Sequence, residues 1–91
     1  MPQTSLRLRI TGRVQGVAFR AWTRGRATAL GLTGWVRNEP WGSVEVHLEG
    51  PDEAVQRMLT DCWSGPAAAD VRDVQAEPAP HEGGTGFEIR A

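Results

Sequence analysis

The 91-residue sequence contains no lysine, a single cysteine, two histidines and no long apolar run. Because Cys62 is alone, the chain cannot form an intrachain disulfide, which is typical of the reducing cytoplasm. No apolar segment approaches the length of a membrane span, and residues 1–5 lack the apolar stretch of a signal peptide. We therefore expect a cytoplasmic protein with no membrane partner, folded as a single domain over residues 1–91.

The scarcity of histidine and cysteine also bears on the chemistry. Neither His47 nor His81 has a histidine or cysteine neighbour at zinc-ligand spacing. His47 alternates with Glu45 and Glu49, so we interpret all three as a solvated strand face, and we place His81 on a surface loop. Cys62 lies on the apolar side of a predicted helix, which indicates a buried thiol. We expect no metal, no other cofactor and no covalent nucleophile.

The basic residues are all arginine, and most lie in the first half of the chain. Residues 1–42 hold seven of the ten arginines and one acid, whereas residues 43–91 hold three arginines and ten acids. A basic half indicates an anionic partner, which could be a nucleic acid or a small phosphorylated substrate. The net charge of −1 argues against strong nonspecific binding to nucleic acid, which depends on a broad basic face.

Hydrophobic periodicity predicts five strands and two helices. The strands are expected at residues 5–11, 33–38, 43–49, 69–76 and 87–89, and the helices at 20–30 and 51–63. Pro51 suits the first helical position of the second helix. The order βαββαβ plus a short final strand favours a ferredoxin-like α+β sandwich, with both helices on one face of a mainly antiparallel sheet.

The stretch Gly12–Arg20 lies between the first predicted strand and the first predicted helix. In such a junction, the N–H groups of the loop and of the first helical turn lack intrachain partners, and the helix dipole adds positive charge. Arg20 can add a planar fork that matches phosphate oxygens. The spacing fits an ordinary strand-to-helix turn equally well, because the lysine and Ser/Thr of a P-loop are missing.

The identities of the residues in this stretch indicate a function more specifically than the glycine spacing does. Gly12–Arg20 closely resembles the signature of the acylphosphatase family. A second family signature resembles the run Gly34-Trp35-Val36-Arg37-Asn38 followed by Gly42, Val44 and Gly50, and a linking motif appears as Leu30-Gly31-Leu32. The resemblance extends from about Leu6 to Arg90. It implies a ferredoxin-like fold and hydrolysis of acyl phosphates to a carboxylate and inorganic phosphate.

The resemblance also implies roles for individual residues. Arg20 matches the catalytic arginine that binds phosphate, and Asn38 matches the catalytic asparagine that orients the attacking water. The phosphate-binding backbone of the family matches Gln15, Gly16, Val17, Ala18, Phe19 and Arg20. The substrate would be a small-molecule acyl phosphate, with inorganic phosphate or sulfate as a further ligand of the site, and no metal is needed. Without the resemblance, Asn38 would be interpreted as a turn-capping residue.

Two other functions can be compared with this one. An RNA-binding module on a similar fold would stack bases on aromatic residues of its central strands. The outward positions of the first and third predicted strands hold no aromatic side chain, and those of the third are acidic, so we expect no nucleic-acid partner. A ligand-sensing domain that has lost activity is disfavoured because both Arg20 and Asn38 are present. We expect a monomer.

Two positions depart from the family pattern. Ala18 stands where many members have glycine, and it would strain the loop if the backbone there requires a positive φ. Trp41 stands where aspartate is common, just before the turn glycine Gly42. It would form either an aromatic wall near the site or an exposed surface patch.

Overall fold

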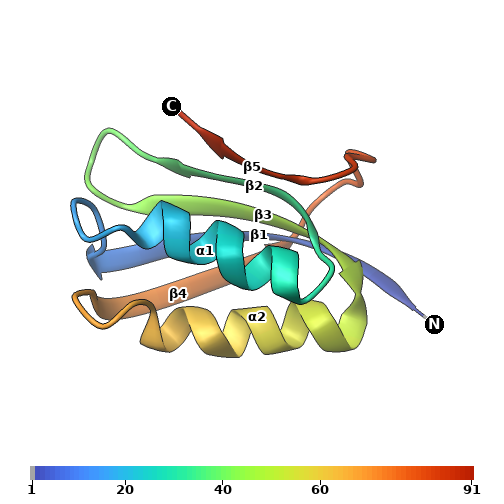
Figure 1. Cartoon of the computed structure of the whole chain (residues 1–91), viewed down its shortest axis with the longest axis horizontal. Coiled ribbons are helices and arrows are strands. Elements are labelled where there is room, and N and C mark those ends of the chain that lie inside the picture. Colours follow the sequence, from blue (N-terminus) through green and yellow to red (C-terminus); the bar gives the residue numbers. More distant parts are fainter. Residues whose placement is uncertain (1) are drawn as a thin grey trace.

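The computed structural model describes residues 2–91, which form a five-stranded sheet and two helices. The elements are β1 (Gln3–Arg13), α1 (Phe19–Ala29), β2 (Thr33–Asn38), β3 (Val44–Pro51), α2 (Asp52–Ser64), β4 (Asp70–Pro78) and β5 (Phe87–Arg90). This order confirms the predicted ferredoxin-like α+β sandwich. Both helices lie on the same face of the sheet (Figure 1). Neither described helix is long and apolar enough to cross a membrane.

The sheet topology brings the ends of two strands to the same side of the molecule. The strand order is β4-β1-β3-β2-β5, and every neighbouring pair is antiparallel except β2 and β5. Because β1 and β2 are both antiparallel to β3, they run in the same direction. The loop after β1 and the turn after β2 therefore lie at the same end of the sheet, as Figure 1 shows.

The hydrophobic core lies between the sheet and the helices. The inward side chains of β3, Val44, Val46 and Leu48, are fully buried, as the alternating pattern predicts. On α2 the predicted apolar face is likewise confirmed, with Val55, Met58 and Cys62 fully buried. Burial raises the pKa of the Cys62 thiol to about 12, so this cysteine is a packing residue that stays protonated.

Glycine is required where β1 leaves the centre of the sheet. The pairing of β1 with β4 shifts register between Thr11 and Gly12, and Gly12 has a φ of 122°. A Cβ atom at this position would lie 2.3 Å from the carbonyl oxygen of Asp70. Only glycine allows this close approach, which turns the chain toward the loop that precedes α1.

The predicted start of the second helix is wrong by one residue. Pro51 has a φ of −56° and a ψ of 138°, which is an extended conformation, and it pairs with Gln3 at the end of β3. The helix therefore begins at Asp52, whose side chain accepts a 2.7 Å hydrogen bond from Thr4. Asp52 and Glu53 still place the two predicted acids in the first turn, where they complement the helix dipole.

The predicted solvated face of β3 is also wrong. The side chains of Glu45, His47 and Glu49 do point away from the helices, but His47 is fully buried and the two glutamates are 8% and 5% exposed. Trp35 of β2 stacks on the His47 ring, with centroids 5.8 Å apart and planes at 17°. The returning loop of residues 79–86 contacts Glu49 at the other side. An aromatic residue therefore does lie on this face, but Trp35 is only 5% exposed.

Candidate active site

The loop between β1 and α1, Val14–Ala18, has two residues in the left-handed region. Gly16 has a φ of 74°, and Ala18, the N-cap of α1, has a φ of 61° and a ψ of 26°. A non-glycine residue in this conformation costs about 1–2 kcal/mol, so the strain expected at Ala18 is present. Ala18 makes no side-chain capping hydrogen bond, and the first turn of α1 holds no acid. The positive end of this helix dipole is therefore not neutralised by a side chain of its own helix.

A pocket of about 240 Å³ opens at this helix terminus and contains both residues predicted to be catalytic. Its lining residues are Val14, Gly16, Ala18, Phe19, Arg20, Ala21, Asn38 and Ile89. Gln15 and Val17, which belong to the predicted phosphate-binding backbone, are not among these lining residues. Ile89 was not singled out by the sequence reasoning, because its place beside the pocket depends on the parallel pairing of β5 with β2.

Arg20 lies on the first turn of α1 and is half-buried. Within residues 2–91, its side chain makes one hydrogen bond, from Nη1 to the carbonyl oxygen of Arg90 at 3.4 Å, and no ion pair with a carboxylate. Arg26 of the same helix, by contrast, is paired with Asp61. Arg20 therefore keeps most of its five N–H donors available for an anion in the pocket.

Asn38 is the last residue of β2, and the turn that follows it is held by other groups. Gly42 N–H donates to the carbonyl oxygen of Glu39 at 3.1 Å, and Glu39 N–H donates to that of Ser43 at 2.8 Å. The Ser43 hydroxyl donates to the Glu39 carboxylate at 2.8 Å. Because these bonds close the turn without the Asn38 amide, a turn-capping role for that amide is disfavoured.

The side chain of Gln15 links the loop before α1 to the turn after β2. Its Nε2 donates to the carbonyl oxygens of Glu39 and Ser43, at 2.8 and 2.9 Å. Arg9 holds the same turn through Nε and Nη2, which lie 3.0 and 3.2 Å from the two carboxylate oxygens of Glu39. The hydrogen bond from Arg9 lowers the pKa of Glu39. The segments that carry Arg20 and Asn38 are therefore fixed relative to each other.

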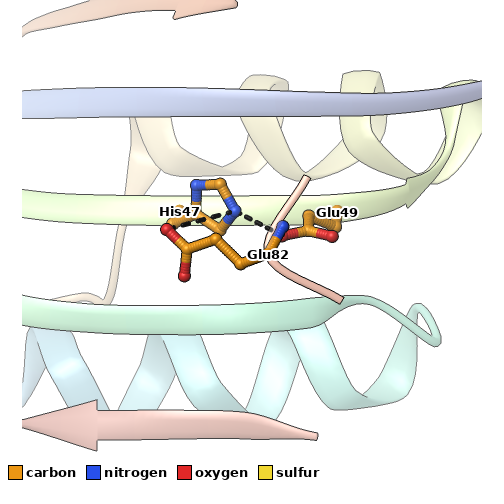
Figure 2. A group of neighbouring side chains, drawn as sticks. All are labelled: His47, Glu49 and Glu82. Atoms are coloured by element: carbon orange, nitrogen blue, oxygen red, sulfur yellow. Dashed lines mark hydrogen bonds and ion pairs between the residues drawn. The ribbon is translucent and has the colours of Figure 1, made fainter. Parts of the chain in front are cut away.

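A second polar cluster lies on the outer face of the sheet, where His47, Glu49 and Glu82 meet (Figure 2). One possible ligand atom from each lies within 4.8 Å of the others, which is close enough to consider a metal ion. The sequence-based prediction concerned histidine and cysteine partners at zinc-ligand spacing; in the structure, the neighbours of His47 are the carboxylates of Glu49 on β3 and of Glu82 from the 79–86 loop. His81 is exposed, as predicted.

Hydrogen bonds within this cluster already use the atoms that a metal would need. Arg7 Nε donates to His47 Nδ1 at 3.4 Å, and His47 Nε2 lies 2.6 Å from Glu49 Oε2. Glu49 also accepts the N–H groups of Glu82 and Gly83 and a hydrogen bond from His81. Burial alone would raise the pKa of Glu49, but these bonds lower it to about 2. We interpret the cluster as a structural network.

Fold and pocket together define a ferredoxin-like protein with a candidate anion site between β1 and α1. The family model described as Acylphosphatase matches residues 6–89. An acylphosphatase of Sinorhizobium medicae is 57% identical over 83 residues, covering 90% of this chain and 88% of that protein. The chain therefore belongs to the acylphosphatase family, a family of hydrolases that act on acyl phosphates.

Solved structures agree with this assignment. An acylphosphatase from Coxiella burnetii matches with a TM-score of 0.93 and 35% identity, covering 97% of this chain and 93% of that one. An acylphosphatase from Bacillus subtilis matches with a TM-score of 0.93 and 34% identity, covering 96% and 98%. The resemblance noted in the two sequence signatures is confirmed at the level of both family and fold.

Proposed function

We propose that this chain hydrolyses the carboxyl–phosphate bond of a small-molecule acyl phosphate, giving a carboxylate and inorganic phosphate. The observation that carries the proposal is the pocket in which Arg20, with free donors, meets Asn38 at the uncapped start of α1. An arginine and a helix N-terminus are the groups that proteins commonly use to bind phosphate. Inorganic phosphate or sulfate would occupy the same pocket.

In the proposed mechanism, Arg20 and backbone N–H groups of the loop hold the phosphoryl group and stabilise its charge. Of the six residues from Gln15 to Arg20, Gly16, Ala18, Phe19 and Arg20 line the pocket. The side chain of Gln15 supports the loop from outside by binding the turn after β2. This arrangement fixes the phosphoryl group against the end of β2.

Asn38 would orient the attacking water. A neutral amide can donate and accept hydrogen bonds without placing a charge near the phosphate. The leaving group is a carboxylate, whose conjugate acid has a pKa of about 4, so its departure needs no general acid. The family resemblance implies that a phosphate oxygen takes the proton of the water and that no metal or other cofactor takes part.

We further propose that the chain works as a single domain and as a monomer in the cytoplasm. The lone cysteine is buried and stays protonated, which suits a reducing compartment. We propose no nucleic-acid partner because Trp35, the aromatic ring that stacks on the outer sheet face, is covered. We propose no membrane partner either.

The test is an assay of benzoyl phosphate hydrolysis by the purified chain, with and without EDTA, together with a phosphate titration followed by NMR. We expect turnover to survive chelation and phosphate to inhibit competitively. The amide shifts should centre on Gly16 to Arg20. Turnover that is lost in EDTA and restored by zinc or magnesium would contradict the metal-free mechanism. Shifts confined to Arg7 and Arg9 would place the anion elsewhere.

A further inference from the structure

A second hollow opens directly beside the phosphate pocket. This groove, with a volume of about 670 Å³, is lined by Gln15, Arg37, Asn38, Glu39, Pro40, Trp41 and Ala91. Asn38 lines both the groove and the pocket that holds Arg20. A molecule whose phosphoryl group occupies the pocket therefore has the groove next to it, on the side where Asn38 lies.

Trp41 is the most prominent apolar group of this groove. Its side chain is 81% exposed, against 49% for Trp63, the other large hydrophobic residue at the surface among residues 2–91. Trp41 sits in the turn after β2, which is closed by the Gly42–Glu39 hydrogen bond and held from the loop side by Gln15. The indole is thus carried on a braced turn, and a ligand that covers it would remove apolar surface from water.

The charged residues that line the groove already have partners inside the protein. Arg37 is paired with Glu45, with Nη2 and Nε 2.6 and 2.7 Å from Glu45 Oε1. The Glu39 carboxylate is held by Arg9 and Ser43. Their charges are balanced within the protein, although the Arg37 side chain stays 48% exposed. The apolar surface that the groove offers to a ligand comes mainly from the indole of Trp41 and the ring of Pro40.

We propose that this groove binds the acyl group of the substrate and that Trp41 makes the enzyme favour acyl phosphates with an uncharged, apolar acyl group, aromatic ones above all. The inference rests on the proposed function, because the acyl group is placed by putting the phosphoryl group beside Arg20. An aromatic acyl group can stack on the indole, whereas a methyl group offers little surface for contact.

The test compares benzoyl phosphate with acetyl phosphate, which present the same phosphoryl group on acyl groups of different size. In Trp41→Ala we expect kcat/KM for benzoyl phosphate to fall by about five-fold, the size of one aromatic contact, and the value for acetyl phosphate to change by less than about two-fold. The loss should lie in KM, with kcat nearly unchanged, because Trp41 contacts the acyl group equally in ground and transition states. Trp41→Phe should restore most of the preference.

Trp63→Ala is the matched control, since Trp63 is exposed on α2 and lines neither hollow. It should leave both substrates unaffected. Equal losses for the two substrates in Trp41→Ala, or no loss for either, would overturn the inference while leaving the proposed function intact. A wild-type chain that hydrolyses neither substrate would overturn the proposed function, and the inference with it.

Discussion

The pocket at the start of α1 and the cluster around His47 both gather polar side chains against the sheet, but they differ in where those side chains find partners. Around His47, hydrogen bonds and ion pairs inside the protein engage Arg7, Glu45, Glu49 and Glu82. In the pocket, Arg20 makes one long hydrogen bond, and the turn beside Asn38 is closed by other groups.

This difference separates a structural cluster from the proposed active site. A buried polar group costs free energy unless it is hydrogen-bonded, so a network that satisfies itself adds stability and leaves nothing for a ligand. Donors left without partners in an open pocket must be satisfied by water or by a ligand. Substitutions of Arg20 and Asn38 should therefore change activity and spare stability, whereas those in the cluster should do the reverse.

The largest effect is expected for Arg20→Lys. Lysine keeps the charge but cannot present a planar fork to phosphate, so we expect kcat/KM for benzoyl phosphate to fall by about a thousand-fold. The melting temperature should stay close to that of the wild type. Arg24→Lys on the exposed side of the same helix is the control and should retain full activity. Near-normal turnover in Arg20→Lys would show that the loop alone holds the phosphate.

Asn38→Ala should lower kcat by about a hundred-fold and change the phosphate inhibition constant by less than about two-fold. The amide is proposed to act on the attacking water, a role in the transition state, whereas phosphate binding depends on Arg20 and the loop. Thermal unfolding of the same variant provides the control. A lower melting temperature with preserved kcat would return Asn38 to a turn-capping role.

Glu49→Gln tests the second region of the comparison, the polar cluster around His47. The pKa of Glu49 is about 2 in the folded protein and about 4.3 in an unfolded chain, so the unfolded state takes up the proton first as the pH falls. The stabilising effect of the ionised carboxylate is therefore complete above about pH 5 and lost toward about pH 2. We expect the variant to be less stable by about 2–3 kcal/mol near neutral pH, and this difference should vanish in acid.

Urea unfolding at a series of pH values measures this effect. Glu88→Gln, at an exposed position of β5, is the control and should change stability little. The folded Glu49→Gln protein should keep its turnover at neutral pH. A variant with wild-type stability but reduced kcat would show that the His47 cluster contributes to the reaction, and the contrast between the two regions would fail.

The smallest effect is expected for Ala18→Gly, which should raise stability by up to about 1 kcal/mol because glycine adopts a positive φ without steric cost. Ala21→Gly, three residues further along α1, makes the same chemical change where φ is helical, and it should lower stability by about 0.5–1 kcal/mol. Urea unfolding of both variants gives the sign. A loss of stability in Ala18→Gly would mean that the alanine is not strained.

The sequence could predict the pocket because its parts are local or follow from strand order. Gly12–Arg20 contains both the strand end and the helix start, and the hairpin of β2 and β3 brings Asn38 to the same end of the sheet. The alternation along β3 correctly placed His47 opposite the core valines. Its burial could not be predicted, because alternation specifies a face and says nothing about what covers it. The cover consists of the Trp35 ring, which stacks on His47, and of a loop more than thirty residues further along the chain, which contacts Glu49 and places Glu82 near His47.

The side chain of Gln15 is a second case in which the sequence pattern did not predict a tertiary contact. The family signature predicted its backbone as part of the phosphate site, yet its side chain binds the carbonyl groups of a turn that is distant in sequence. Pro51 was placed one residue too far into the helix because its pairing with Gln3 across the sheet depends on tertiary structure. In each case a long-range contact decided the outcome.

Ile89 of β5 lines the pocket, and the carbonyl oxygen of Arg90 accepts a hydrogen bond from Arg20, a contact between residues 70 positions apart. Closing so long a loop is entropically costly and tends to come late when a chain folds. The order in which the helices and the site form during folding can therefore be measured. In a refolding experiment, helical structure should recover before the ability to turn over substrate, and recovered turnover would report the docking of the last strand.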